Sequence, residues 1–163
     1  MKATQLLKKD HGAIKKLFAE FARTTSRAPR RRQQLMDKIA EKLEIHSTIE
    51  EEIFYPAVKG VRGGKSLVNE AESEHRQVDS LVAEAQGMTI VTNEVAQKVR
   101  ELRDAVLHHA TEEEQEMFPI AEDGLREQLS DLGEQLAARK KELATSRLQK
   151  AKRAVKKAVR KVA

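Results

Sequence analysis

The sequence predicts an all-α protein: an up-down-up-down four-helix bundle with an additional C-terminal helix and a basic tail. Strong helix formers (Ala, Leu, Glu, Lys, Arg and Gln) dominate the 163 residues, and no segment shows the sustained alternation of β-branched residues that is typical of strands. Residues that cap or interrupt helices gather at 24–29, 59–66, 86–93 and 119–124. They leave four segments of roughly 20 to 30 residues, and short connections between long helices favour antiparallel neighbours.

Each of the four segments carries apolar residues at helical spacing, so each can bury one face against its neighbours. These residues are Leu7, Ile14, Leu17, Phe18 and Phe21 in the first segment, Leu35, Ile39, Leu43, Ile49 and Ile53 in the second, Leu67, Val78, Leu81 and Val82 in the third, and Val95, Val99, Leu102, Val106 and Met117 in the fourth. A chain of this length buries a sizeable core without disulfides. We expect residues 1–120 to form the bundle and residues 121–163 to form a C-terminal amphipathic helix with a Lys/Arg-rich tail.

The composition excludes several classes of protein and site. The chain has no cysteine, so it holds neither a disulfide nor a thiolate metal site. Its N-terminus, MKATQLLKKDHG, lacks the apolar core of a secretory signal, and no apolar run approaches the ~18 residues of a transmembrane segment. We therefore expect a cytoplasmic protein that is a monomer or a homodimer.

Parts of the sequence are repeated. HSTIEEEIFYP, at positions 46–56, appears again in the second half of the chain as HATEEEQEMFP, at positions 109–119. The pattern D-H-x-x-I, which begins at Asp10, appears again as E-H-x-x-V, which begins at Glu74, with almost the same offset along the chain. This predicts a duplicated helical hairpin, with acid-His on each outgoing helix and His-x-x-x-Glu on each return helix. Pro56 is expected to mark the end of its helix.

The repeat predicts that four histidines and two glutamates meet inside the bundle. Each histidine lies about ten residues from the same end of the antiparallel bundle, which at 1.5 Å per residue is about 15 Å deep. Each of the two glutamates lies four residues after a histidine and therefore shares its helix face. The residues are His11, His46, Glu50, His75, His109 and Glu113.

Such a group is either a set of satisfied core or surface residues or a metal site. A metal site is favoured, because burying several ionisable groups without a compensating cation is costly. Imidazole and carboxylate ligands without thiolate suit iron, manganese or zinc. A structural zinc site needs only four ligands, so six candidates favour two ions, which the two carboxylates can bridge.

Four motifs in order, D-H-x-x-I, H-x-x-x-E-E-E-x-F-Y-P, E-H-x-x-V and H-x-x-x-E-E-x-x-M-F-P, resemble those of the hemerythrin-like, HHE cation-binding family, in its bacterial single-domain form. The resemblance covers residues 1 to about 120. It implies a four-helix bundle with a non-haem di-iron centre whose two iron ions are oxo- or hydroxo-bridged, with manganese or zinc as substitutes. By similarity the six residues named above would be the iron ligands, and the two glutamates would bridge.

One position departs from the pattern of the oxygen-carrying members of this family. They place a second histidine one turn after the first on the third helix, whereas here that position is Asp79. A changed ligand set implies a changed redox potential and a changed number of open positions. The resemblance therefore implies peroxide or diatomic-gas chemistry ahead of reversible oxygen transport, with Asp79 as a metal ligand or a neighbour of the ligands.

Several residues near the motifs have roles that the sequence leaves open. Tyr55, the single tyrosine, either reaches the iron as a phenolate or packs in the core. His108 either supports the ligands or lies exposed on its helix. Asp10 and Glu74, each directly before a histidine, are expected near the opening of the site. The glutamates expected to face water are Glu51, Glu52, Glu112 and Glu114.

The net charge of +5 conceals an acidic body and a basic tail. Residues 139–163 hold eleven Lys or Arg and one acid, a net of +10, which leaves residues 1–138 at −5. The tail could neutralise phosphates of DNA or RNA without sequence specificity, lie on anionic lipid, pack against the acidic body, or serve only as a solubilising end. The tail residues expected to contact nucleic acid or another anionic partner are Lys150, Lys152, Arg153, Lys156, Lys157, Arg160 and Lys161.

We therefore expect a non-haem di-iron protein that binds or reacts with hydrogen peroxide, oxygen or nitric oxide in oxidative or nitrosative stress defence. As an enzyme it would be an oxidoreductase of the di-iron catalase or peroxidase type. The alternative is a non-catalytic iron or oxygen sensor, or a nucleic-acid-associated metal-binding protein that acts through its basic tail.

Overall fold

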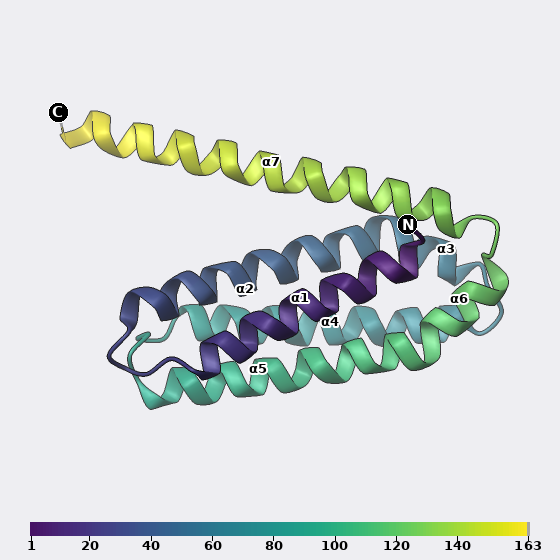
Figure 1. Cartoon of the computed structure of the whole chain (residues 1–163), viewed down its shortest axis with the longest axis horizontal. Coiled ribbons are helices and arrows are strands. Elements are labelled where there is room, and N and C mark those ends of the chain that lie inside the picture. The colour runs from purple at the N-terminus through teal and green to yellow at the C-terminus, as the bar shows by residue number, and fades with distance from the viewer. Residues whose placement is uncertain (163) are drawn as a thin grey trace.

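The structure is a computed structural model that describes residues 1–162, and within this range it contains only helices and the loops between them. The elements are α1 (Ala3–Ala22), α2 (Pro29–Ile49), η1 (Glu50–Phe54), α3 (Tyr55–Lys59), α4 (Gly64–Gln86), α5 (Asn93–Glu112), η2 (Glu113–Met117), α6 (Phe118–Gly124) and α7 (Leu129–Val162). Helices α1, α2, α4 and α5 run alternately up and down, and α7 lies outside them (Figure 1). The predicted four-helix bundle with an additional C-terminal helix is confirmed. None of the described helices is long and apolar enough to cross a membrane.

Local signals in the sequence explain where three of the loops lie. Pro29 occupies the first position of α2, where its missing N–H needs no partner. Gly63, directly before α4, has a φ of 81°, a left-handed conformation that favours glycine. The side chain of Thr92 caps α5 by accepting a hydrogen bond from the N–H of Val95 at 3.2 Å. The first three expected breaks are therefore confirmed.

The fourth expected break, at residues 119–124, is wrong, because these residues belong to α6. Pro56 likewise does not end its helix: α2 continues through η1 into α3, and α5 continues through η2 into α6. The segments η1 and η2 are π-helical turns, and in η1 the N–H of Tyr55 donates to the carbonyl of Glu50, five residues back. The wider turn begins a new α-helical register, and proline is tolerated in its first turn.

The interior of the bundle has two apolar clusters with a polar layer between them. One cluster gathers where α3, α6 and the start of α7 meet, and it includes Leu7 and Phe118. The other includes Phe18 and Leu102 and lies towards the loops that follow α1 and α4. Along α1, the buried His11 lies between Leu7 of one cluster and Phe18 of the other. The packing of both ends therefore holds the polar layer at a fixed depth.

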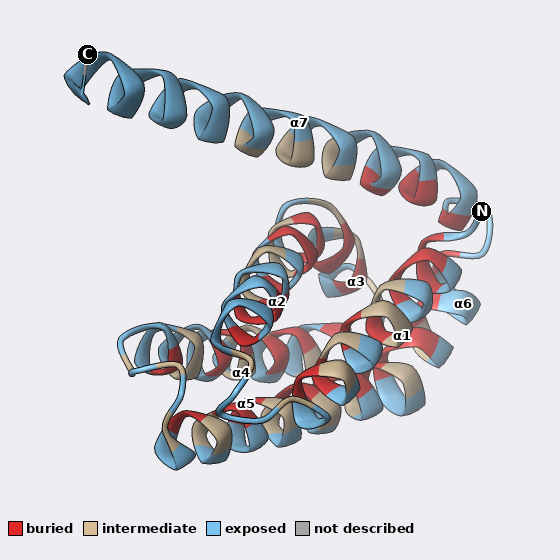
Figure 2. Ribbon diagram, turned by 60° about the vertical axis from the view of Figure 1, so that its left-hand side comes forward, coloured by how far each residue is buried: buried red, intermediate tan, exposed pale blue. Residues whose placement is uncertain are grey.

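The first part of α7 belongs to the same core as the bundle. Leu129, Leu132 and Leu136 are buried in the apolar cluster next to α3 and α6. Gly133 allows close approach, because a Cβ at this position would lie 2.0 Å from the carbonyl oxygen of Met1. Further along, the buried stretch of α7 gives way to exposed residues (Figure 2). The division of the chain into two domains at residue 120 stays a prediction.

Candidate metal centre

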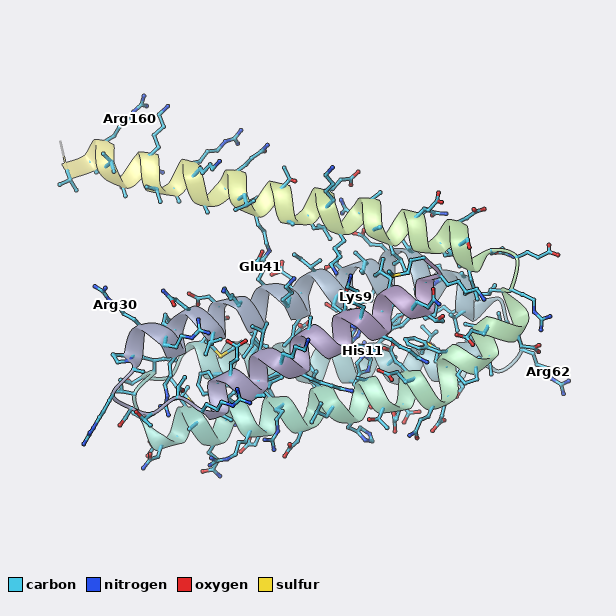
Figure 3. All side chains as sticks on the ribbon, viewed as in Figure 1. Lys9, His11, Arg30, Glu41, Arg62 and Arg160 are labelled. Atoms are coloured by element: carbon cyan, nitrogen blue, oxygen red, sulfur yellow. The ribbon has the colours of Figure 1, made fainter. Side chains whose placement is uncertain are left out.

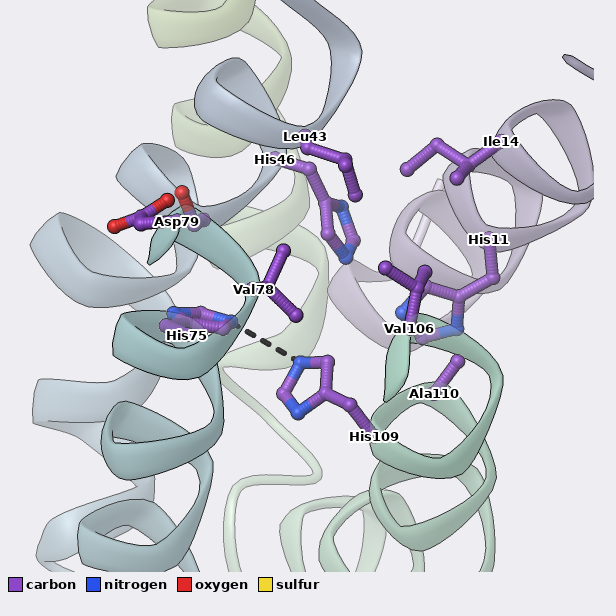
Figure 4. A pocket seen from close by; sticks show the side chains of 11 residues that line it. His11, Ile14, Leu43, His46, His75, Val78, Asp79, Val106, His109 and Ala110 are labelled. Carbon is purple, nitrogen blue, oxygen red and sulfur yellow. Dashed lines mark hydrogen bonds between the residues drawn. The ribbon is translucent and has the colours of Figure 1, made fainter. Parts of the chain in front are cut away.

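The structure brings the six expected ligand residues together in the polar layer. Their side chains come from α1, from α2 and η1, from α4, and from α5 and η2. None of the six is more than 5% exposed, so the group is closed off from bulk water. Figure 4 shows the four histidine rings pointing towards one another from their helices. The residues are His11, His46, Glu50, His75, His109 and Glu113.

The potential ligand atoms form two adjoining clusters. The first combines both histidines of the first hairpin with Glu50 and Glu113, and the second combines both histidines of the second hairpin with Glu50. Within each cluster the atoms lie within 4.8 Å of one another. Each hairpin therefore supplies the histidine pair of one cluster, as two neighbouring cations would require.

Both glutamates face histidines of both hairpins. The carboxylate oxygens of Glu50 lie 3.2 Å from Nε2 of His46 and 3.3 Å from Nε2 of His75. Oε2 of Glu113 lies 3.2 Å from Nε2 of the α1 histidine and 3.6 Å from Nε2 of the α5 histidine. Carboxylates placed centrally in this way are suited to bridging two ions.

On α1 and α4, the outgoing helices of the two hairpins, a further carboxylate contacts Nδ1 of the histidine, the outer ring nitrogen, which points away from the centre. Nδ1 of His11 lies 2.8 Å from Glu114, and Nδ1 of His75 lies 2.7 Å from Glu51. A carboxylate only accepts hydrogen bonds, so Nδ1 carries the proton, and Nε2, which faces inwards, is the atom that can bind a metal. Glu51 is exposed, as expected, and Glu114 is partly exposed, but each also contacts a histidine, a contact that was not predicted from the sequence. Their separation along the chain, which equals that of the glutamates beside them, could have shown their shared role.

On the return helices, the partners are the acids that precede the other two histidines. Nδ1 of His109 lies 2.7 Å from Glu74, which is hydrogen-bond distance. A partner of this kind fixes the orientation and tautomer of an imidazole and increases its basicity as a ligand. Nδ1 of His46 lies 3.7 Å from Asp10, close enough for the carboxylate to act on it electrostatically but too far for a hydrogen bond.

Several buried polar atoms of the group have no hydrogen-bond partner within the described chain. They are Nε2 of His11, both ring nitrogens of His46, Oε1 of Glu50 and Oε2 of Glu113. Such atoms are rare in folded proteins, and each costs about 1 to 3 kcal/mol. A cation held between the inward nitrogens and the carboxylate oxygens would satisfy most of them together. The donor set therefore fits metal ions.

Burial and mutual contact shift the pKa values of the group. Burial lowers the pKa of His46 to about 4, which keeps this imidazole neutral, as metal binding requires. Burial and the charge of Glu113 raise the pKa of Glu50 well above its usual value. Although burial alone would raise it, the pKa of Glu113 is lowered because His109 and His11 face it. Without a cation, burial and mutual repulsion therefore disfavour having both carboxylates charged at once.

An aromatic residue follows each of the two central glutamates by five positions and stacks on a histidine. The ring centroids of Tyr55 and His75 are 5.5 Å apart, and those of Phe118 and His11 are 6.0 Å apart. Only Tyr55 adds a polar atom: its hydroxyl donates to Glu113 at 2.8 Å and lies 3.2 Å from Nε2 of His75. The two halves of the centre are therefore unequal.

A cavity of about 20 Å³ lies beside the clusters. Its wall contains the four histidines and apolar side chains, among them Leu43, Val78 and Val106 (Figure 4). Asp79 also lines the cavity, but it is exposed, and its carboxylate belongs to neither cluster. A space of this size holds about one water-sized molecule. The centre is therefore next to room for a very small ligand.

His108 lies outside both clusters. Its side chain is 66% exposed, and its Nε2 lies 3.0 Å from Glu112 and 3.4 Å from Glu74. Because Glu74 also holds Nδ1 of His109, His108 is connected to the centre through one carboxylate. Glu52 faces outwards as expected and pairs with Arg139 of α7.

Comparisons with known proteins agree with the fold and with the binding of a cation. The family model described as hemerythrin HHE cation binding domain matches residues 2–121. A crystal structure of a hemerythrin HHE cation binding domain-containing protein, the Rv2633c homolog from Mycobacterium kansasii, superposes with a TM-score of 0.79 at 28% identity and covers 93% of each chain. The uncharacterized protein Rv2633c of Mycobacterium tuberculosis is 29% identical over 153 residues, 91% of each chain.

A further relative is much longer than this chain. The DNA nickase of Nostoc sp. is 26% identical over 125 residues, which are 77% of this chain and 35% of that protein. This chain therefore spans about a third of the length of that relative. The family model matches most of the chain, and the chain has the helical bundle with clustered histidines and glutamates. The chain therefore belongs to the hemerythrin HHE cation-binding domain family.

Proposed function

We propose that the chain is a non-haem di-iron protein that reacts with hydrogen peroxide, oxygen or nitric oxide in the cytoplasm, in defence against oxidative or nitrosative stress. The observation that supports this most directly is the pair of adjoining clusters, which share Glu50 and contain buried polar atoms without partners. Cation binding is a property of the family. The identity of the metal, the number of ions and the reaction are our proposal.

The proposed ligands divide between the two hairpins. The histidines of each hairpin would hold one ion, with Glu50 and Glu113 bridging. Imidazole and carboxylate ligands suit iron, with manganese or zinc as substitutes. The hydroxyl of Tyr55 would add an oxygen only beside His75, in the second hairpin. If both glutamates bridge, the ion beside His11 and His46 would then have one donor fewer than the ion beside His75 and His109, which leaves it more open to an external molecule. Asp79, which is exposed, supplies none.

The cavity supports a very small substrate. Bound iron would supply the redox chemistry that peroxide, oxygen and nitric oxide undergo. The chain controls access, because Ile14, Leu43, Val78 and Val106 line the cavity with apolar surface and exclude bulk water. A space of about 20 Å³, which holds about one water-sized molecule, favours very small ligands over bulky organic peroxides.

Metal analysis of protein purified from iron-supplied cells tests this proposal. We expect about two irons per chain, an absorption from oxo-to-iron charge transfer, and oxygen release from added hydrogen peroxide that stops when a chelator removes the iron. Less than one iron per chain would refute the di-iron assignment. A chain that binds two irons and leaves peroxide, oxygen and nitric oxide unchanged would instead be the non-catalytic sensor.

Tyr55→Phe tests the unequal halves of the centre. We expect the variant to keep both irons, because it loses only the hydroxyl, and to react with peroxide roughly 10- to 100-fold more slowly. If the phenolate binds iron, a phenolate-to-iron absorption band disappears as well. Burial and the nearby carboxylates raise the pKa of Tyr55, which favours the protonated hydroxyl. If Tyr55 keeps this proton and donates it in a hydrogen bond to Glu113, no such band is expected.

Phe118→Tyr is the matched comparison, because Phe118 stacks on His11 as Tyr55 stacks on His75. It places a hydroxyl at the equivalent position beside the first hairpin. We expect it to slow the reaction by occupying space next to the more open ion. An unchanged spectrum and rate in Tyr55→Phe would show that its hydroxyl has no part in the centre.

A further inference from the structure

The C-terminal helix α7 separates from the bundle after Arg147. Up to this point, Arg139, Lys140 and Arg147 form ion pairs with carboxylates of the bundle. Every described residue after Arg147 is exposed. Figures 1 and 2 show this part of α7 diverging from α2, and Figure 3 shows Arg160 pointing into solvent near its end. We call residues 148–162 the free arm.

The side of α7 that faces the bundle changes character at the start of the free arm. Leu129, Leu136 and Leu143 follow one another at intervals of seven residues and pack on the apolar core. The next two positions in this row are Lys150 and Lys157. The apolar row that holds α7 on the bundle therefore ends at Leu143, and the free arm has lysines at the next two positions of this row.

The free arm has an apolar stripe on a different face. Its first residue follows Leu143 by five positions, which is about 140° round the helix. The following members are spaced by three or four residues, as on one face of a helix. Its four larger side chains are between 63% and 90% exposed. The stripe consists of Leu148, Ala151, Val155, Val159 and Val162.

The remaining surface of the free arm is cationic. Residues 148–162 contain seven Lys or Arg and no acid. Two copies of such a helix repel each other, so a second free arm is an unfavourable partner for the stripe. A partner that complements this surface must be anionic and must also accept apolar side chains.

We propose that the free arm binds the surface of an anionic lipid bilayer. Its length of roughly 22 Å lets it lie in the plane of the membrane, with the apolar stripe at the boundary of headgroups and acyl chains and the lysines and arginines among the headgroups. Nucleic acid matches the charge, but it offers nothing to the Leu and Val stripe, and the arm has no aromatic residue for base stacking. The arm thus attaches the bundle to a membrane without crossing it.

Co-sedimentation of the full chain with vesicles tests the proposal. At about 0.1 M salt, we expect binding to vesicles that contain phosphatidylglycerol and little binding to phosphatidylcholine alone. The charge variant Lys152→Gln, Lys156→Gln, Arg160→Gln should weaken binding about fivefold for each residue replaced. Arg126→Gln, which removes an exposed arginine outside the arm, is its control.

The apolar variant Leu148→Gln, Val155→Gln, Val159→Gln separates lipid from nucleic acid. It keeps every charge and alters only exposed side chains, so the bundle stays folded. We expect it to bind anionic vesicles at least about tenfold more weakly and to bind duplex DNA as the parent chain does. Val91→Gln, at an exposed valine of the bundle, should change neither.

Three outcomes would overturn the proposal. The first is equal vesicle binding by the apolar variant and the parent chain, which would show that the stripe does not enter the membrane. The second is tight binding to DNA with no binding to anionic vesicles, which would assign the arm to nucleic acid. The third is a dimer that the apolar variant dissociates, which would assign the stripe to a second copy of the chain.

Discussion

Replacing Glu113 with alanine is expected to lower bound iron from about two ions per chain to one or fewer, and to lower the melting temperature of the iron-loaded protein by about 10 °C. Oε2 of Glu113 lies 3.2 Å from Nε2 of His11 and 3.6 Å from Nε2 of His109, so this carboxylate faces both hairpins. Without it the first cluster keeps only Glu50 as a carboxylate. Iron that no longer binds the folded chain no longer stabilises it.

The comparison that isolates this effect is the melting temperature with iron and after chelation. The removal of a buried side chain also destabilises the metal-free chain, so the difference between the two states carries the information. Glu116→Ala is the matched control, because Glu116 lies in the same π-helical turn but is exposed. Glu113 would not be a ligand if Glu113→Ala still bound two irons per chain. Its melting temperature would then also rise on iron loading by as much as that of the parent chain.

The level at which the histidines meet could be predicted from the sequence because it depends only on counting. In an antiparallel bundle, residues at equal distances from the same end lie side by side, and the nearly constant offset between the two halves of the repeat sets those distances. His11, between the apolar residues Leu7 and Phe18, reaches the polar layer for this reason. An error of one or two residues in the predicted position of a loop does not alter such a prediction.

The π-helical turns could not be predicted in the same way. Proline is expected to end a helix, and a helix end at Pro56 leaves no reason to expect a π-helical turn before it. The structure instead has such a turn, η1, which contains one residue more than an α-helical turn. The extra residue decides the role of Tyr55. In an α-helix, a residue five positions after Glu50 lies about 140° away, whereas a π-helical turn closes after five residues and returns the ring to the side of Glu50. A pattern of Glu and aromatic residue five apart, directly before proline, is the signal that both return helices share.

The carboxylates that hold the outer nitrogens were missed for a different reason. Glu51 and Glu114 are partly exposed, and a run of glutamates on a helix is usually a solvated face. Their contacts depend on how two helices are rotated relative to each other, which no single helical pattern contains. The duplication nevertheless gives some of this information, because a contact made in both halves of the repeat requires equivalent residues in both halves.

Glu51→Gln and Glu114→Gln are expected to weaken iron binding roughly 10- to 100-fold each, with the fold of the bundle retained. Each carboxylate lies within 2.8 Å of Nδ1 of a histidine, and it fixes the tautomer that turns Nε2 towards the metal. Glutamine keeps the size of the side chain and its carbonyl oxygen, and it loses the charge that makes the imidazole a stronger ligand. The dissociation constant is measured by competition with a chelator of known affinity.

The two variants also test whether the halves of the duplicated hairpin act alike. Glu51 supports a histidine of the second cluster and Glu114 one of the first, so each variant should weaken mainly the ion of its own cluster. Glu52→Gln is the control, because Glu52 follows Glu51 directly but pairs with Arg139 of α7 instead of a histidine. If Glu51→Gln and Glu52→Gln bind iron equally well, the charge of the carboxylate at Nδ1 does not set the affinity. The inward Nε2 atoms and the bridging carboxylates would then account for it alone.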